Sequence, residues 1–264
     1  MPTKRIGEET VKKIAIKKNK VTIHFEKRKV TLSGNAFTEF RLYEGKTVPP
    51  TEMRQILDAE SLDDLSSYAM RLLSHENYSE HDLREKLWAK GADLEQSRKI
   101  IFRFKKQGLL DDELYAKSYA EDVADLRLLG KRRVLFDLHK HGIPSEITEK
   151  LEFPFDKEFD KARRYASILD RRFSRIPTLR KDVKAIQALL NRGFDERVAK
   201  EACGLLTPND PKEEKKRLDG AYKAAKTRYG KKYEGYELKR RIFAYLLSKG
   251  YRYEDIQALQ EEKR

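Results

Sequence analysis

The chain has 264 residues and a formal net charge of +14, because 58 Lys and Arg residues outnumber 44 Asp and Glu residues. Charged residues make up 39% of the chain and apolar residues another 39%, which argues against a single thick core and favours thin or repeated packing. One cysteine excludes an internal disulfide. No apolar run has the length of a signal peptide or a membrane span, so we expect a cytoplasmic monomer without membrane contact.

The first 60 residues form the part of the sequence that favours β-structure. Residues 11–32 alternate β-branched side chains with Lys and Thr, and breaks at residues 19–20 and 27–28 predict two or three antiparallel strands. A further extended stretch is expected from Phe37 to Tyr43, and Pro49-Pro50 closes the region. The side chains predicted on one face of the sheet are Ile14, Ile16, Val21, Ile23 and Phe25.

From residue 51 onward the sequence predicts helices, and a motif recurs four times. Each copy has an apolar residue eight positions before a glycine, Leu four before it and a basic side chain immediately before it. A glycine directly after a helix accepts the left-handed backbone that ends it, and the Leu then contacts the residue after the glycine. The four Leu and Gly pairs are Leu87 and Gly91, Leu138 and Gly142, Leu189 and Gly193, and Leu246 and Gly250.

Capping signals are spaced like these glycines. Ser61, Asp111 with Asp112, Asp156 and Asp210 are each followed by acidic residues, as at helix N-termini. A second helix is expected to open at Ser79. The sequence therefore predicts a mainly α protein in which tandem three-helix repeats form an elongated, curved solenoid behind a small antiparallel β-rich region. The predicted divisions are a β-rich region at 1–60 and repeats at 61–111, 112–155, 156–209 and 210–264.

No motif for a reaction or a cofactor is present. Gly45-Lys46-Thr47 resembles the end of a phosphate loop, but Phe40 stands where the first glycine should be. His139 and His141 are two apart on a predicted helix and face different sides, which does not suit one metal. Asp111 and Asp112 fit a capping role better than a metal pair. We therefore expect no enzyme activity, no cofactor and no metal.

Basic clusters are the remaining candidates for function. Positive charge is concentrated in residues 1–60 and 156–264, and Lys and Arg beside aromatic rings can hold phosphates and stack bases. The candidates for binding a nucleic acid or its protein complex are Arg127, Lys131, Arg132, Arg133, Lys140, Arg163, Arg164, Arg171, Arg172, Lys239, Arg240 and Arg241.

Three motifs in residues 62–151 follow one another in the order and spacing of a known family. The first runs from Leu72-Leu73 through Tyr78-Ser79-Glu80 to residues 83–87, and the second is Gly108-Leu109-Leu110-Asp111-Asp112 with Tyr115-Ala116. The third comprises Arg127, Gly130, Arg133, Leu138, Gly142 and Ile143. With these motifs the chain resembles the RecX family of recombination regulators, in particular the longer members from Gram-positive bacteria.

The resemblance implies a protein that lies in the groove of the RecA filament on single-stranded DNA. It further implies that the protein regulates, mostly by inhibition, the ATPase, strand exchange and co-protease activities of RecA in DNA repair and the SOS response. The implied partners are the RecA filament and single-stranded DNA, with double-stranded DNA left open.

Two other functions compete with this interpretation. An autonomous, sequence-independent DNA-binding protein is the first alternative, since residues 79–91 followed by another helix resemble a helix-turn-helix. An enzyme is the second, and only the clustered carboxylates suggest it.

Overall fold

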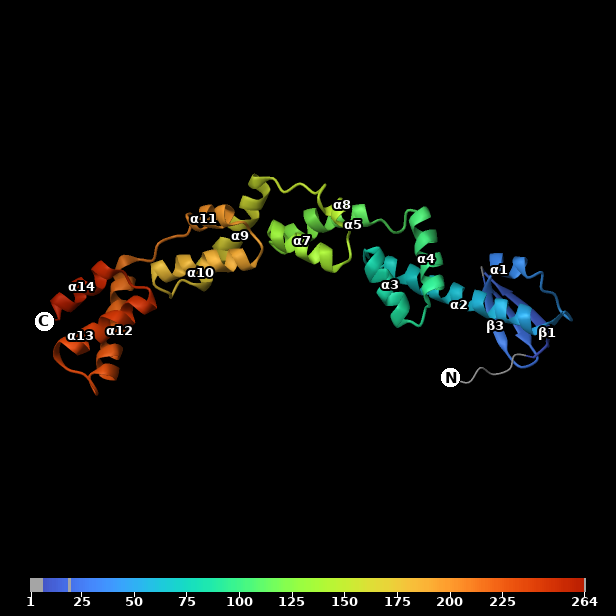
Figure 1. Ribbon diagram of the computed structural model, residues 1–264, viewed down its shortest axis with the longest axis horizontal. Coiled ribbons are helices and arrows are strands. Elements are labelled where there is room, and N and C mark those ends of the chain that lie inside the picture. Colours follow the sequence, from blue (N-terminus) through green and yellow to red (C-terminus); the bar gives the residue numbers. More distant parts are fainter. Residues whose placement is uncertain (1–6, 19, 264) are drawn as a thin grey trace. The chain divides into compact units, whose positions relative to one another are not determined.

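The computed structural model describes residues 7–18 and 20–263. The chain is divided into two compact units, one of residues 1–115 with 141–143 and one of residues 116–140 with 144–264. The predicted class is confirmed, because helices dominate and a small antiparallel sheet stands at the N-terminal end (Figure 1). The solenoid and the repeat boundaries stay predictions. Within the described residues, none of the helices combines the length and apolar character of a membrane span.

The first unit begins with a four-stranded antiparallel sheet. Its order is β3-β2-β1-β4, and its strands are β1 (Glu9–Lys17), β2 (Lys20–Phe25), β3 (Lys29–Ser33) and β4 (Thr47–Val48). The predicted strands are thus confirmed; residue 19, on which one break was placed, lies outside the described residues. The face prediction is confirmed by the pairing of Ile14 with Ile23 and of Ile16 with Val21, although Ile16, next to the last residue of β1, is 72% exposed. A register shift between Val11 and Lys13 lets Val11 join the same core.

Residues 37–43 do not form the predicted extended stretch. Helix α1 (Gly34–Glu39) occupies this position, and the Ser33 hydroxyl accepts a hydrogen bond from the Ala36 N–H at 3.3 Å. The capping serine overrides the local aromatic residues, because it satisfies an N–H at the start of a helical turn. Phe37 and Phe40 pack against the sheet core from α1 and the residue that caps its end.

A long helix, α2 (Pro50–Leu73), joins the sheet to the first helical group. Pro50 stands at its first position, where the missing N–H costs nothing. The predicted helix start at Ser61 is therefore wrong: Ser61 lies inside α2, and its hydroxyl accepts a hydrogen bond from Gln96. The first half of α2 completes the sheet core with Met53 and Ile56. Its second half packs with α3 (Glu80–Ala89) and α4 (Leu94–Lys106).

Capping at the start of α3 joins three segments of the first unit. The Ser79 hydroxyl accepts from the Asp82 N–H at 3.0 Å, as predicted, and donates to the His141 carbonyl at 2.7 Å. Asp111 caps α5 (Asp112–Ser118) by accepting from Glu113 and Leu114 N–H groups. Asp112 serves α3 instead of its own helix, since its carboxylate accepts the Glu80 N–H at 2.8 Å.

The described residues of the second unit form helices and connecting loops, without a strand. Two of its cores are formed by α9 to α11 and by α12 to α14. The predicted cap at Asp210 is confirmed. The predicted cap at Asp156 is wrong, because Pro154 occupies the N-cap position of α9 and Asp156 lies within the first turn of that helix. The elements are η1 (Tyr119–Val123, a π-helical turn), α6 (Ala124–Leu126), α7 (Lys131–Lys140), α8 (Ser145–Thr148), α9 (Phe155–Arg172), α10 (Thr178–Asn191), α11 (Glu196–Cys203), α12 (Pro211–Tyr229), α13 (Gly235–Lys249) and α14 (Tyr253–Glu262).

The four motif glycines all have positive φ, between 71° at Gly142 and 99° at Gly91. At three of them the residue after the glycine donates to the carbonyl of the motif Leu: Ala92 to Leu87, Phe194 to Leu189 and Tyr251 to Leu246. These are the bonds of the predicted helix-ending motif. The Leu side chains and the residues after the glycines are buried, so each motif closes a helix and fills a core position.

Two of these glycine turns also form joints between helices of the second unit. The Gly130 N–H donates to the Arg192 carbonyl at 3.1 Å, and the Arg132 N–H donates to the Gly193 carbonyl at 3.0 Å. The start of α7 thus receives the last carbonyls of α10. The start of α10 likewise meets the end of α13, but there a side chain makes the bond: the Arg180 guanidinium donates to the Ser248 carbonyl at 3.0 Å. Each contact brings a negative helix end to a positive one.

Candidate functional site

Several candidate cations lie at the corner between α6 and α7. Leu128 turns the chain there with a positive φ of 53°. Arg192 fixes the corner from α10, because its guanidinium donates to the Arg127 carbonyl at 2.5 Å and the Leu128 carbonyl at 3.3 Å. The same guanidinium lies 4.9 Å from the centre of the Tyr165 ring. Arg192 is therefore a structural residue of this corner.

Acidic partners neutralise two of the three candidates that begin α7. Arg132 pairs with Asp195 at 2.9 Å, and Arg133 pairs with Asp137 at 2.9 Å, which raises the pKa of Arg133. Asp137 also accepts from the Tyr119 hydroxyl at 3.0 Å, and burial together with that carboxylate raises the pKa of Tyr119. Lys131 has no carboxylate at its ammonium within the described residues, and the ammonium lies 5.7 Å from the Phe153 ring.

A buried ion pair supports this helix start from α9. Glu158 accepts the Lys131 N–H at 2.9 Å and pairs with Lys161 at 2.5 Å. The Lys161 ammonium also donates to the Leu129 carbonyl at 2.9 Å. Both side chains are 7% exposed, and burial of a charge is tolerated only where such partners exist. Glu158 and Lys161 thus hold the basic start of α7 in place.

The candidates on α9 divide into a paired and an unpaired set. Arg163 pairs with Asp160 at 2.8 Å, which lowers the pKa of that carboxyl, and Arg164 pairs with Asp160 at 3.2 Å and with Asp125 before the corner. The structure therefore brings Arg164 to the same corner as Arg127. Arg171 and Arg172 lie in the last turn of α9. Neither has a carboxylate partner in the part of the chain that the structure describes.

The remaining candidates lie on α13 and at the end of α7. Arg240 and Arg241 share the Glu237 carboxylate at 3.2 and 3.0 Å, and these bonds lower the pKa of Glu237. Arg241 also lies 5.0 Å from the Tyr233 ring. Lys239 and Lys140 are exposed. The twelve predicted cations thus form separate groups, and about half are occupied by acidic side chains.

Four cations that the sequence analysis did not select line a common pocket. Arg175, Arg180, Lys184 and Lys249 line one pocket of the second unit. Two signals for them are present in the sequence: Arg180 and Lys184 are four apart on a helix, and Lys249 is the basic residue of a glycine motif. Their convergence depends on the joint between α10 and α13, which the sequence does not reveal.

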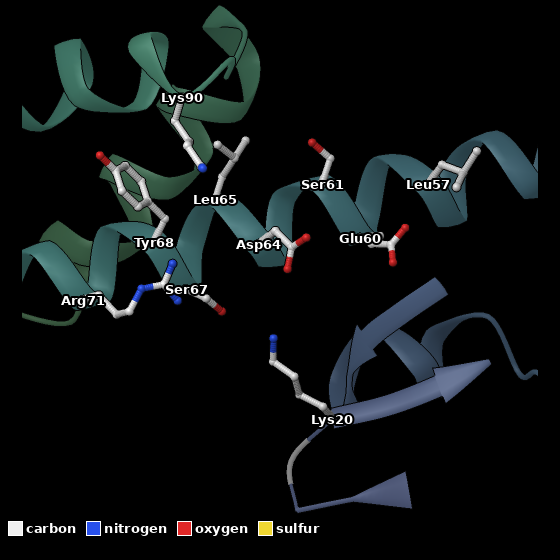
Figure 2. Close-up of a pocket in the computed structure, with 10 residues that line it drawn as sticks. All are labelled: Lys20, Leu57, Glu60, Ser61, Asp64, Leu65, Ser67, Tyr68, Arg71 and Lys90. Atoms are coloured by element: carbon white, nitrogen blue, oxygen red, sulfur yellow. The ribbon is translucent and has the colours of Figure 1, made fainter. Parts of the chain in front are cut away.

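A pocket of about 550 Å³ in the first unit has a mixed lining. Figure 2 shows Lys20 of the sheet pointing toward α2, which carries Glu60, Asp64 and Arg71. Lys90 at the end of α3 lies 5.6 Å from the Tyr68 ring. Since the three cations share the pocket with two carboxylates, it does not favour an anionic ligand as strongly as the pocket in the second unit.

Metal-binding side chains do not gather anywhere in residues 7–18 and 20–263: no three His, Cys, Asp or Glu groups are placed to hold an ion. The carboxylates of Asp111 and Asp112 bind backbone N–H groups, and Cys203 is buried. These residues stabilise helix starts and a core.

Comparison with known proteins gives a consistent result. No protein-family model matches the chain. Regulatory protein RecX of Streptococcus gordonii is 26% identical over 241 residues, covering 89% of this chain and 91% of that protein. Regulatory protein RecX of Lactococcus lactis subsp. cremoris is 29% identical over 241 residues, covering 88% of each.

Solved structures agree on the fold. A crystal structure of regulatory protein RecX superposes with a TM-score of 0.60 at 24% identity, covering 72% of this chain and 96% of that one. RecX from Lactobacillus salivarius gives a TM-score of 0.50 at 23% identity, covering 56% of this chain and 97% of that one. The relatives match nearly end to end, and in sequence and fold the chain is similar to the RecX family of regulatory proteins.

Proposed function

We propose that this protein regulates the RecA recombinase by binding the filament that RecA forms on single-stranded DNA. The observation that carries the proposal is the match to regulatory RecX proteins over about nine tenths of the chain. In this proposal the protein is a cytoplasmic monomer without a reaction of its own. It acts mostly as an inhibitor of RecA's ATPase, strand exchange and co-protease activities.

The geometry supports a repeated binding surface. The proposed repeats at 61–111, 112–155, 156–209 and 210–264 each contain a glycine-terminated helix, and their stacking into a curved solenoid would suit the spiral groove of a filament. Helix joints such as Gly130 with Arg192 supply a regular means of stacking. Exposed cations without carboxylate partners, among them Lys131, Arg171 and Arg172, are then available to an acidic protein surface and to DNA.

Electron microscopy of the protein added to preformed RecA filaments tests the proposal. Regular decoration of the filament groove, or shortening of filaments, is the expected result. Coating of bare DNA with no change to RecA filaments would instead favour the alternative, an autonomous DNA-binding protein. The unpaired cations beside aromatic rings, such as Arg172 at 6.0 Å from the Phe173 ring, are the observation that keeps this alternative worth testing.

A further inference from the structure

One pocket of the second unit combines strong positive charge with aromatic walls. We name it the α10–α13 pocket; it has a volume of about 320 Å³. Its charged and aromatic lining residues are Arg175, Arg180, Lys184, Lys249, Tyr245 and Tyr251. None of its lining residues within the described chain is a carboxylate. This separates it from the pocket beside the sheet, which contains Glu60 and Asp64.

The joint between α10 and α13 creates this concentration of charge. Gly250, with a φ of 91°, has no side chain, and a Cβ there would overlap the Cβ of Arg180. The two backbones can therefore approach closely enough for Arg180 to donate to the Ser248 carbonyl at 3.0 Å. Lys249 lies in the chain between Ser248 and Gly250, the two residues that contact Arg180. Lys184 follows Arg180 by one helical turn. Cations about 70 residues apart in sequence thus meet at one opening.

The charges of the pocket are not neutralised from inside the protein. Arg175, Lys184 and Lys249 have no carboxylate partner among the described residues. The Lys184 ammonium lies 5.8 Å from the Phe173 ring and the Lys249 ammonium 5.1 Å from the Tyr245 ring. A nearby carboxylate, Glu214, is occupied by the N–H and the hydroxyl of Thr178 at 2.8 and 2.6 Å. Unpaired like charges held together repel one another, and an anion relieves that repulsion.

A phosphate diester of single-stranded DNA fits this arrangement better than a compact free anion. The cations lie beside the rings of Phe173 and Tyr245, so a phosphate held by Lys184 and Lys249 would have aromatic side chains within reach of its bases. Aromatic stacking beside a basic groove is the general mode by which proteins hold single strands. Arg171 and Arg172, which are exposed and precede Arg175 by four and three positions, would be available to further phosphates of the strand.

We propose that the α10–α13 pocket binds a backbone phosphate of single-stranded DNA. The inference rests on the proposed function, because it assigns the DNA contact of a RecA regulator to a defined place in the molecule. It also separates two sets of cations: Arg163, Arg240 and Arg241, which the sequence analysis selected, stay with their carboxylates, whereas Lys184 and Lys249, which it did not select, bind the ligand.

The test is the affinity of the full-length protein for a fluorescein-labelled oligothymidylate, measured by anisotropy over a range of salt concentrations. The site variant is Lys184→Gln with Lys249→Gln. The matched control is Lys200→Gln with Lys223→Gln, which removes the same charge from surface lysines paired with Glu196 and Asp219. We expect the site variant to bind roughly tenfold more weakly, and its log–log salt slope to fall by about 0.7, the contribution of one phosphate contact on a single strand. The control should stay within about twofold of wild type.

Other results have definite meanings. Equal losses in both variants would contradict the proposal, because the effect would then come from net charge alone. Displacement of the oligonucleotide from wild type by inorganic phosphate at constant ionic strength, with saturation, would identify a free anion as the ligand and also contradict it. Unchanged oligonucleotide affinity combined with a lost effect on RecA would assign the pocket to a protein contact.

The same variants separate this inference from the proposed function. If wild type binds the oligonucleotide through the pocket but leaves RecA unaffected, the phosphate site stands and the regulatory function is wrong. If wild type affects RecA and the site variant binds DNA normally, the function stands and the phosphate site is wrong.

Discussion

The backbone of Gly193 lies directly against that of Arg133, so closely that a Cβ on Gly193 would overlap the Arg133 nitrogen. Gly193 ends α10 with a φ of 93°, and Arg133 lies in the first turn of α7. The glycine therefore meets two requirements at once: a left-handed backbone and a close approach between two helices. Gly130 faces the same contact from the other side, and its N–H donates to the Arg192 carbonyl.

Gly193→Ala should destabilise the protein by roughly 3 kcal/mol, of which about 1–2 kcal/mol is backbone strain at positive φ and the rest the displacement of α7. Urea unfolding followed by circular dichroism measures the change. Gly91→Ala is the matched control, because Gly91 has a φ of 99° but open space around it, so only the strain applies. Equal losses in the two variants would show that the close approach contributes nothing.

Glu158→Ala should cost about 3–5 kcal/mol, because it leaves the Lys161 ammonium buried without its counter-charge and the Lys131 N–H without an acceptor. Glu196→Ala removes an exposed partner of Lys200 and should leave the free energy of unfolding nearly unchanged, because solvent screens that pair. Both are measured by urea unfolding. A loss below about 1 kcal/mol for Glu158→Ala would mean that water reaches the pair in solution.

The Cys203 thiol should resist labelling in the native protein. Burial, with a smaller effect of Asp182, raises the pKa of Cys203 to about 11, so only about 0.1% of it is thiolate at pH 8. Reaction with Ellman's reagent should therefore be at least about 100-fold slower than in urea-unfolded protein. Since Cys203 shares a core with Phe194, Gly193→Ala should accelerate the labelling. Rapid labelling of wild type would contradict the packing of that core.

Asp112 should make the protein less stable as pH rises from about 4 toward neutrality. Burial raises the pKa of Asp112 above its ordinary value, although the bond from the Glu80 N–H acts in the opposite direction. A group with a raised pKa binds more protons in the folded than in the unfolded state, so its contribution declines as pH rises through that interval. Asp112→Asn keeps an acceptor for Glu80 and should flatten this part of the stability curve. If stability fell more steeply with rising pH in the Asn variant than in wild type, the pKa of Asp112 would be lowered rather than raised, and the prediction would be wrong.

Local signals predicted local structure well in this chain. The glycine motifs ended helices where expected because positive φ depends on one residue, and Ser79, Asp111 and Asp210 capped helices because their side chains reach N–H groups two or three positions away. The predicted helix start at Ser61 was wrong, because a serine inside a longer helix has no free backbone N–H group to cap. The register shift between Val11 and Lys13 depends on pairing with β2, which no alternation of residue types encodes.

Candidate site residues were harder to predict, because runs of Lys and Arg in sequence do not show which of them find acidic partners. Arg163, Arg164, Arg240 and Arg241 attract attention as doublets, yet carboxylates one helical turn away occupy them. The cations of the α10–α13 pocket are isolated in sequence and gather only through a helix joint between distant segments. The paired arginines and the cations of the α10–α13 pocket therefore differ in their tertiary contacts, which the local charge pattern of the sequence does not show.

ATP hydrolysis by RecA on single-stranded DNA, measured with this protein at equimolar amounts, tests the central claim most directly. A regulator that binds the filament should lower the steady-state rate, and the Lys184→Gln with Lys249→Gln variant should lower it less than the Lys200→Gln with Lys223→Gln control does. An unchanged rate with wild-type protein that is folded and binds DNA would contradict the account.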